Sequence, residues 1–471
     1  MKRYLKQFIN FSLLLAIMSN LTSCEKFFEV ERDTSINRPP LYVDDYESML
    51  NQRSLTELDF LLSDLMSDDV YFSDQNRTVS SIYYMHNAYL WDYDFYDNDD
   101  QDVIYRSSYI NILQLNIVIS KVLAAPGGSL DLKERLHSEA RIQRAWHYLQ
   151  LINIYSAGYG SDNSRLGVPL VTLPDADINI PKRATIKEVY DLILSDLNEV
   201  VNSNSLPIRG KDLLHPGKLA AMSLLSRVYL LMGDFDNALK YANEVLDIEN
   251  GLLSYNEVDL NKESLPRILT EYANNPKEIL FLKVAKNSLL LGAIKEQLSI
   301  SDDLYAIYNT NDLRVKLNFD VPTSAAQKVK YKRYNAGTVL YSNMSITVPE
   351  IMLIKAECLA RRGEGVQAIS LVNELASNRF SPENFVPIDI NASNALQIVL
   401  EERRRELFLR GGLRLFDLKR LNKESDLQKV IERKDNKGSV IASLSPNSNR
   451  YIMPFAPIVL FANPNIIQNE R

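Results

Sequence analysis

Residues 223–246 read SLLSRVYLLMGDFDNALKYANEVL, and this stretch decides the fold. Its apolar residues recur every three to four positions, which is the period of an amphipathic helix. Gly233 and Asp234 interrupt the period, and small residues at Ala238 and Ala242 let two helices pack closely. A helix, a tight turn and a second helix within about 34 residues are typical of a tetratricopeptide unit.

A second copy of this unit lies 130 residues further along the chain. The matching positions are Gly233 and Gly363, Ala238 and Ala368, Leu239 and Ile369, and Asn243-Glu244 and Asn373-Glu374. So many matches at one shift indicate an internal repeat. Because a lone helix pair cannot bury its apolar face, such units are expected to stack.

Further repeat pairs and long insertions are predicted around these two copies. We expect helical repeat pairs at about residues 105–155, 185–246 and 348–420, and a region of mixed structure at about residues 279–310. The stretches between them lack the helical period and are rich in Pro, Asn, Asp and Tyr. The predicted fold is therefore mainly α: a tetratricopeptide-repeat helical scaffold with long irregular loop insertions and a few short strands.

The composition narrows the class of protein. The chain has 471 residues, of which 46% are hydrophobic and 24% charged, as in ordinary globular proteins. Its formal net charge of −7 argues against nucleic acid as a partner, because phosphate binding needs a basic surface. With only four histidines, no metal and no other cofactor is expected. No catalytic motif occurs either, although composition alone leaves a glycosidase carboxylate pair open.

The N-terminal segment predicts export and lipid attachment. Three basic residues precede an apolar run at residues 8–18, which is shorter than the roughly 20 residues needed to span a bilayer. Leu21-Thr22-Ser23-Cys24 resembles the lipobox of bacterial lipoproteins, so residues 1–23 are predicted to be a lipoprotein signal peptide and Cys24 to be acylated. Cleavage removes three positive charges and takes the formal net charge from −7 to −10. The alternative is an ordinary secretory signal with a chance cysteine.

The only other cysteine, Cys358, lies in an apolar helical stretch. We expect it to be a small buried hydrophobic residue and not a nucleophile.

Seven segments spread over residues 24–471 carry a family resemblance. They are residues 24–30 (CEKFFEV), 109–112 (YINI) with Asn116, 139–145 (EARIQRA), 275–281 (NPKEILF), 401–407 (EERRREL), 414–420 (RLFDLKR) and 463–469 (NPNIIQN). In order and spacing they resemble the SusD/RagB family of outer-membrane nutrient-binding lipoproteins. The chain departs from the family pattern at Thr347, where an arginine is often found, and at Tyr105, where tryptophan is usual.

This resemblance implies a function as well as a fold. It implies a SusD-like scaffold that is lipid-anchored to the outer membrane at the cell surface. The implied function is the capture of an oligosaccharide or peptide that the protein does not change chemically. It also implies a SusC-like TonB-dependent outer-membrane transporter as the partner that receives the nutrient. Two alternatives stay open: a repeat lipoprotein that binds only other proteins and no nutrient, and an enzyme on the same membrane.

An aromatic and acidic stretch at residues 83–109 is the strongest candidate for ligand contact. Sugars present C–H faces that stack on aromatic rings, while their hydroxyls bond carboxylates and amides. The ligand-binding candidates are Trp91, Tyr93, Asp94, Phe95, Tyr96 and Asn98, with Tyr334 and Tyr341 in a later insertion. The alternative is that these rings pack beneath the loop. A calcium site at residues 97–102 would lack the glycine and glutamate of an EF-hand loop.

Charged residues of the last repeat are interpreted as structural. Arg403 interrupts an apolar helical face, and a buried arginine is costly unless it is paired. Glu402, Glu406 or Glu350 is expected to supply the partner; the alternative is an arginine that grips a ligand. The structural ion-pair candidates are Glu350, Glu402, Arg403, Glu406, Arg414 and Asp417.

Overall fold

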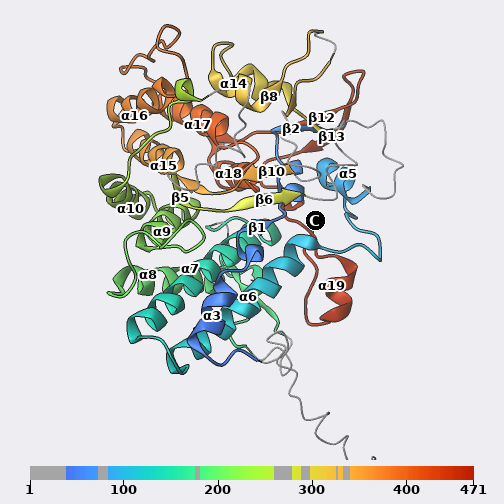
Figure 1. Ribbon diagram of the computed structural model, residues 1–471. Helices are drawn as coiled ribbons and strands as arrows, with labels where there is room; N and C mark the ends of the chain where they lie inside the picture. The colour runs from blue at the N-terminus through green and yellow to red at the C-terminus, as the bar shows by residue number, and fades with distance from the viewer. Residues whose placement is uncertain are drawn as a thin grey trace, which may run out of the picture. The chain divides into compact units, whose positions relative to one another are not determined.

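The helical repeats are present in the structure, a computed structural model that describes residues 39–72, 83–160, 162–174, 181–258, 278–287, 298–324, 327–331 and 340–471. The unit at residues 223–246 corresponds to α9 (Lys218–Met232) and α10 (Phe235–Ile248), and its copy to α15 (Val348–Arg361) and α16 (Gly365–Ser377). The first residues of α9 and α15 are 130 positions apart, as are those of α10 and α16. Since α10 packs against α15, the two copies are also neighbours in space (Figure 1).

A glycine in the left-handed backbone conformation ends the first helix of each copy. Gly233 has a φ of +80° and Gly363 a φ of +81°. A side chain is strained in this conformation, which is why glycine is preferred there. In the first copy, the Asp234 side chain then accepts a hydrogen bond from the backbone N–H of Asn237 and begins α10. Glu364, at the corresponding place in the second copy, accepts no such bond, so the first turn is the better specified.

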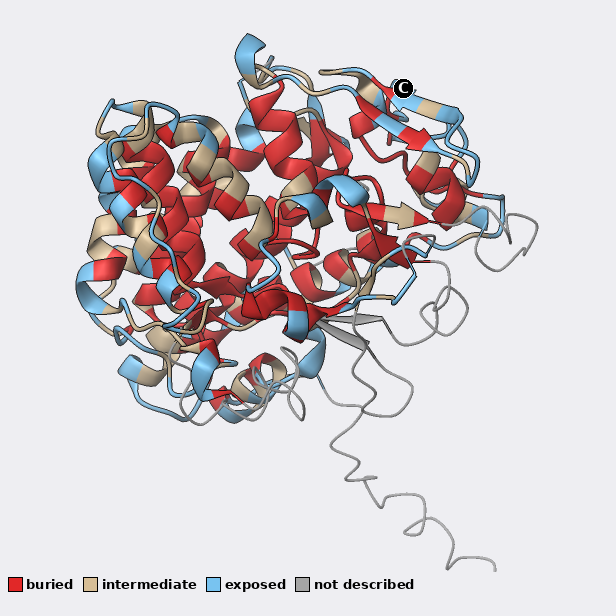
Figure 2. Cartoon of the chain, turned by 90° about the horizontal axis from the view of Figure 1, so that it is seen from above, coloured by how far each residue is buried: buried red, intermediate tan, exposed pale blue. Residues whose placement is uncertain are grey.

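Helices on either side of the two copies extend the stack. α6 (Val103–Lys121) packs against α7 (Leu130–Tyr155), α7 against α8 (Ile186–Asn202), and α8 against α9. α17 (Ala395–Glu406) packs against α15 and α16, and α18 (Leu413–Leu421) follows it in the chain. Buried residues, red in Figure 2, run along these helices. The predicted mainly α, tetratricopeptide-type fold is confirmed.

Shorter elements occupy the insertions and the two ends of the described chain. The short helices are α3 (Val43–Leu50), α4 (Leu61–Leu65), α5 (Tyr83–Leu90), α13 (Asp302–Ala306), α14 (Leu313–Asn318) and α19 (Pro457–Ala462). Single 3₁₀ turns lie at Arg53–Leu55, Val122–Ala124, Tyr255–Glu257, Ser425–Leu427 and Asn449–Tyr451. The strands are β1 (Glu57–Leu58), β2 (Val70–Phe72), β3 (Leu166–Pro169), β4 (Arg183–Thr185), β5 (Ile279–Phe281), β6 (Val284–Asn287), β7 (Leu298–Ile300), β8 (Phe319–Asp320), β9 (Lys330–Tyr331), β10 (Leu340–Asn343), β11 (Ile346–Thr347), β12 (Ile431–Lys434) and β13 (Val440–Leu444).

These strands form small sheets that join distant parts of the sequence. The largest has the order β2-β7-β9-β8, and a second sheet has the order β1-β6-β10. β5 pairs antiparallel with β11, which leads directly into α15. β12 and β13 form a hairpin near the C-terminus (Figure 1). The four-stranded sheet and this hairpin border the cleft described below.

One hydrophobic core cluster includes residues from Leu58 to Ile466 and so unites the repeats with the insertions. Cys358 is fully buried within it, as predicted, and burial raises the pKa of its thiol to about 12. None of the helices in the described part of the chain combines the length and apolar content of a membrane span. The predicted signal peptide and Cys24 lie outside the described residues, so both stay predictions.

Candidate functional site

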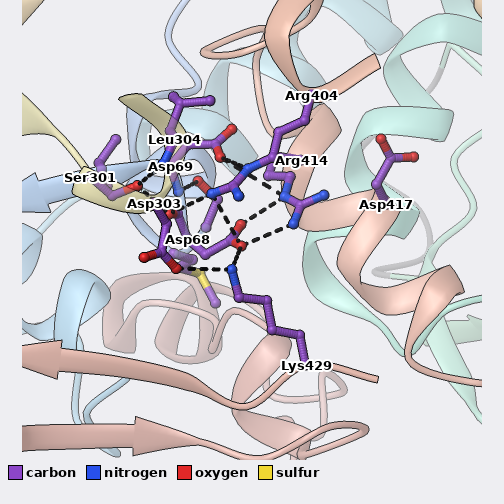
Figure 3. A network of polar contacts seen from close by, with 12 residues as sticks. Asp68, Asp69, Ser301, Asp303, Leu304, Arg404, Arg414, Asp417 and Lys429 are labelled. Atoms are coloured by element: carbon purple, nitrogen blue, oxygen red, sulfur yellow. Dashed lines mark hydrogen bonds and ion pairs between the residues drawn. The ribbon is translucent and has the colours of Figure 1, made fainter. Parts of the chain in front are cut away.

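Two adjacent buried aspartates, Asp68 and Asp69, organise the site. Arg414 from α18 donates two hydrogen bonds to Asp68, from Nε to Oδ1 at 2.7 Å and from Nη2 to Oδ2 at 2.9 Å. Arg404 from α17 donates to Asp69 Oδ1 at 2.7 Å, and Lys429 Nζ to Asp68 Oδ2 at 2.9 Å (Figure 3). The last two scaffold helices are therefore tied to the segment that leads into β2.

The two carboxyl groups differ in the direction of their pKa shifts. Burial alone would raise the pKa of Asp68, but Arg414, Arg404 and Lys429 hold that pKa well below its usual value. Burial also raises the pKa of Asp69, and the negative charge of the adjacent Asp68 adds to this shift. The hydrogen bond that Arg404 donates to Asp69 opposes the shift without cancelling it, so the pKa of Asp69 is raised. Asp68 is thus the ionised anchor of the network.

A cleft of about 770 Å³ opens over this network, and we call it the hairpin cleft because the β12–β13 hairpin forms one of its walls. Tyr71 of β2 and Tyr89 of α5 contribute aromatic rings to its lining. Lys429 lies at its border with the network, because its Nζ is 2.9 Å from Asp68 Oδ2 and 3.2 Å from Asp303 Oδ2. The other polar lining residues include Asp302, Lys328, Asp435 and Asn436. Its volume lies within the roughly 300–1,000 Å³ of small-molecule sites.

Arg433 of β12 supports the cleft from the inside. Its guanidinium carbon lies 4.0 Å from the ring centre of Tyr89 and 4.3 Å from that of Trp91. It also donates to four backbone carbonyls, those of Tyr89, Val70, Leu65 and Ser67. The side chain therefore fastens the hairpin to α5 and to the aspartate segment.

The predicted ligand-binding loop divides into buried and exposed residues. Trp91 is 0% exposed, and Phe95 and Tyr96 are also buried. Trp91 Nε1 donates to the Met66 carbonyl at 2.8 Å, so its polar edge is used inside the protein. Tyr93, Asp94 and Asn98 are exposed. Only these last three present a surface to a ligand, and their contact with one stays a prediction.

Trp91 also shapes the loop through its backbone. Its φ of +53° is left-handed, and it ends α5 where a glycine would be usual. The N–H of Asp92 donates to the Asn87 carbonyl at 2.8 Å and that of Trp91 to Ala88 at 3.2 Å, which is the Schellman pattern. Burial of the indole thus offsets a strained conformation.

The remaining predicted ligand contacts lie in the insertion before α15. Tyr334 is outside the described residues. Tyr341 belongs to β10, whose backbone pairs with β6, and nothing is described of its side chain. Among the candidate calcium ligands, Asp102 is buried, caps the start of α6 and accepts a hydrogen bond from the Tyr155 hydroxyl at 2.6 Å.

The predicted partner of Arg403 was wrong. Its Nε donates to Asp417 of α18 at 2.9 Å, and no bond joins it to Glu402, Glu406 or Glu350. Glu402 and Glu406 instead accept from Arg314 of α14 at 2.7 and 2.8 Å. Arg403 lies on the face of α17 that is turned toward α18. The two glutamates are turned toward α14, which belongs to an insertion whose position cannot be predicted from the spacing of residues in the sequence.

Glu350 pairs with a residue of the other repeat copy. Arg227 of α9 donates from Nε to Oε1 at 2.7 Å and from Nη2 to Oε2 at 2.6 Å, and both side chains are buried. The pair joins α9 to α15. It also gives Glu350 an arginine partner although Thr347 occupies the place where the family often has one.

Sequence reasoning missed the residues of the hairpin cleft, Tyr71, Lys429 and Arg433 above all. One signal was available in the sequence: Arg433 is two residues from the apolar Ile431, so a strand would place both side chains on the same face. The structure buries both of them. No such signal marks Tyr71 or Lys429, because their neighbours in the cleft come from four distant segments.

A stacked-helix scaffold that holds a polar, aromatic-lined cleft on its insertions defines a class of ligand-binding repeat proteins. Comparison with known proteins narrows this class. A family model described as "Starch-binding associating with outer membrane" matches residues 26–230, and the SusD family model matches residues 341–471. Together they cover more than half of the chain, which therefore belongs to the SusD/RagB family.

Individual relatives are distant in sequence but span at least 90% of the chain. A SusD-like protein of Formosa agariphila, P38, is 22% identical over 99% of both chains. A putative sugar-binding protein from Bacteroides vulgatus is 22% identical, with a TM-score of 0.70 over 92% of this chain and 99% of its own. Surface glycan-binding protein A from Bacteroides uniformis is 16% identical, with a TM-score of 0.68 over 90% and 99%. At these identities the two solved structures establish a shared fold.

Proposed function

We propose that the protein captures an oligosaccharide at the cell surface in the hairpin cleft and passes it to a TonB-dependent outer-membrane transporter. The observation that carries this proposal is the cleft itself. Tyr71 lines the same cavity as the carboxylates of Asp302 and Asp303 and the amide of Asn436. The Tyr71 hydroxyl donates to Asn436 Oδ1 at 2.5 Å, and Lys328 Nζ lies 5.2 Å from the centre of the ring. Rings and hydrogen-bonding groups in one cavity suit the two kinds of surface that a sugar presents.

A rigid setting favours binding in this cleft. Lys429 is fixed between Asp68 and Asp303, and Arg433 is fixed by four carbonyls and two rings. Preorganised side chains lose little conformational freedom when a ligand binds, which increases affinity. The sugar- and glycan-binding names of two relatives and the starch-binding description of one family model agree with an oligosaccharide and give no support to a peptide.

Attachment to the outer membrane through Cys24 and delivery to a SusC-like transporter belong to the same proposal. The lipobox sequence supports the anchor, and the family description supports association with the outer membrane. No catalytic step is part of the proposed function.

Calorimetric titration with a panel of neutral and acidic oligosaccharides and peptides tests ligand capture. Tyr71→Ala is expected to weaken oligosaccharide binding about tenfold, the loss of one stacking contact. Tyr42→Ala is the matched control, since that tyrosine is 49% exposed on another part of the surface and does not line the cleft. Equal affinity of the two variants for the oligosaccharide would show that the hairpin cleft is not the binding site. Release of shortened sugars during the titration would indicate an enzyme.

Delivery to a transporter needs a separate experiment. The full chain is expected to co-purify with a barrel transporter after mild detergent extraction of its native membrane, and Cys24→Ala to leave the membrane fraction. If the protein binds no sugar and instead recovers a soluble protein in stoichiometric amount, the protein–protein interaction alternative holds.

A further inference from the structure

A second cavity, of about 430 Å³, lies apart from the hairpin cleft at the end of α18. Three basic side chains line it: Arg165, Lys419 and Lys423. We call it the basic pocket. None of the described residues that line it is an aspartate or glutamate, whereas the hairpin cleft mixes both charges.

The two lysines of the basic pocket are held by carbonyl groups and not by carboxylates. Lys419 Nζ donates to the carbonyls of Asn153 at 2.5 Å and Ser156 at 2.9 Å, both at the C-terminal end of α7. Lys423 Nζ donates to the Tyr159 carbonyl. These bonds have a structural use, because a cation at the end of a helix satisfies its free carbonyls and its dipole. They leave the positive charges without a counter-ion.

Hydrogen-bond donors remain unused at all three cations. An ammonium group has three N–H donors, of which Lys419 uses two and Lys423 one. Arg165 has five, and its side chain donates only to Asn449 Oδ1, at 3.1 Å. The acid nearest in sequence, Asp162, accepts from the backbone N–H and the hydroxyl of Ser164 and does not line the pocket. These hydrogen bonds lower the pKa of Asp162, and the charge of Arg165 contributes to that shift without an ion pair between them.

Desolvation lowers the pKa values of the two lysines. Desolvation and, to a smaller extent, the charge of the neighbouring Lys423 together lower the pKa of Lys419 to about 7. Desolvation and, to a smaller extent, the charge of Arg420 together lower the pKa of Lys423 to about 8. Lys419 is buried and Arg165 and Lys423 are half-buried, and no carboxylate of the described residues lines the pocket with them, so the three basic groups face it without a negative charge in its lining.

Two glycines of the loop after α7 border the pocket. Gly158 and Gly160 line it, and a methyl group added at Gly158 would lie 3.3 Å from Lys423 Nζ. The absence of side chains at these positions leaves the ammonium group reachable. Ser448 and Asn449 add polar groups to its lining.

We propose that Arg165, Lys419 and Lys423 form a binding site for an oxyanion, the sulfate or carboxylate group of an acidic ligand. Charge-assisted hydrogen bonds from the unused donors would hold the anion. That the acidic ligand is a sugar rests on the proposed function; the oxyanion site itself does not.

Calorimetric titration of the purified protein with sodium sulfate, against sodium chloride at equal ionic strength, tests the site. Saturable binding of sulfate is expected. Lys423→Ala and Arg165→Ala should each weaken it by at least about tenfold, as the loss of one charge-assisted bond implies. Lys423→Arg should retain it. Lys240→Ala is the control, since it removes one exposed positive charge outside the pocket. Equal heats for the two salts, or unchanged affinity in both pocket variants, would overturn the proposal.

Titration with glucuronate, a sulfated monosaccharide and glucose tests whether the anion that binds is part of an acidic sugar. The two acidic sugars are expected to bind and to compete with sulfate, and glucose to do neither. Sulfate binding without binding of either acidic sugar would mean a site for small anions only and would overturn the assignment to an acidic ligand. These probes report on the basic pocket whether or not the hairpin cleft binds a neutral oligosaccharide, so the two proposals can fail separately.

Discussion

Glu139 of α7 is a buried carboxyl group whose two oxygens accept no hydrogen bond from the described residues. Its side chain is 2% exposed, and Arg135 Nη1 lies 3.5 Å from Oε1 without a hydrogen bond. Burial raises the pKa of Glu139 from 4.5 to about 8, and Arg135 opposes the shift only in part. The folded protein therefore keeps a proton at Glu139 that the unfolded chain has already released at neutral pH.

This proton makes the stability of the protein depend on pH. Between about pH 4.5 and 8 the unfolded chain binds fewer protons at this residue, so its contribution to the free energy of unfolding falls as pH rises, by at most about 1.4 kcal/mol per unit. Glu139→Gln should flatten that slope and be the more stable protein at pH 8. Urea denaturation at pH 5, 6, 7 and 8 measures it, and parallel curves for the two proteins would contradict the assignment.

Individual side chains show where sequence reasoning stops. We expect Arg403 to be paired because it interrupts an apolar helical face, and it is paired with Asp417. The identity of that partner was not predictable, because Asp417 lies beyond the turn between α17 and α18 and the helical period does not predict the path of a turn. Likewise the density of aromatic residues at 83–109 indicated a cluster, but not that Trp91 and Phe95 face the core and Tyr93 faces solvent.

At the scale of the elements, two glycines set the turns of the repeated unit. Gly233→Ala and Gly363→Ala should each lower the free energy of unfolding by about 1 kcal/mol, because φ near +80° strains a Cβ although no neighbour lies within 4 Å of it. Gly233→Asn should cost less, since asparagine tolerates this conformation. Thermal or urea unfolding measures the three variants. A loss at Gly233→Asn equal to that of alanine would show that strain is not the cause.

The ion pair between α9 and α15 joins the two repeat copies. Glu350→Gln leaves Arg227 charged and buried without its partner, so we expect a loss of about 3–5 kcal/mol. The double variant Arg227→Met and Glu350→Leu should recover much of it, because burial of the two charges is itself costly. Asp191→Asn, which breaks the exposed Lys187–Asp191 pair, is the control and should cost less than about 1 kcal/mol. Additive losses in the double-mutant cycle would argue against direct coupling.

The helices were the predictable elements because their apolar period and turn glycines are local signals. A shift of 130 residues in the sequence reappears as the spacing of the helix starts. The short strands were not predictable individually: β1 and β8 have two residues each and exist only through pairing with distant segments. The hairpin cleft is built from such segments, which is why it was missed.

At the scale of the whole molecule, one core cluster includes residues from Leu58 to Ile466. Scaffold and insertions should therefore unfold together, and differential scanning calorimetry of the protein should give one transition with equal calorimetric and van't Hoff enthalpies. Arg414→Ala, which detaches α18 from Asp68, should lower the temperature of that single transition. Two resolved transitions in the unaltered protein would show that an insertion folds on its own.

The β5–β11 pair has a consequence for how proteins of this kind diverge. Residues 282–345 leave the scaffold at β5 and return at β11, where Phe281 is paired with Ile346 and Ile279 with Thr347. The two ends of this insertion are hydrogen-bonded neighbours, and the entropy of closing a loop grows only slowly with its length. Mutation can therefore change the length and sequence of the exposed parts of this insertion, including its wall of the cleft, while its core residues and the repeats keep their positions. Recognition and scaffold can evolve at different rates within one chain.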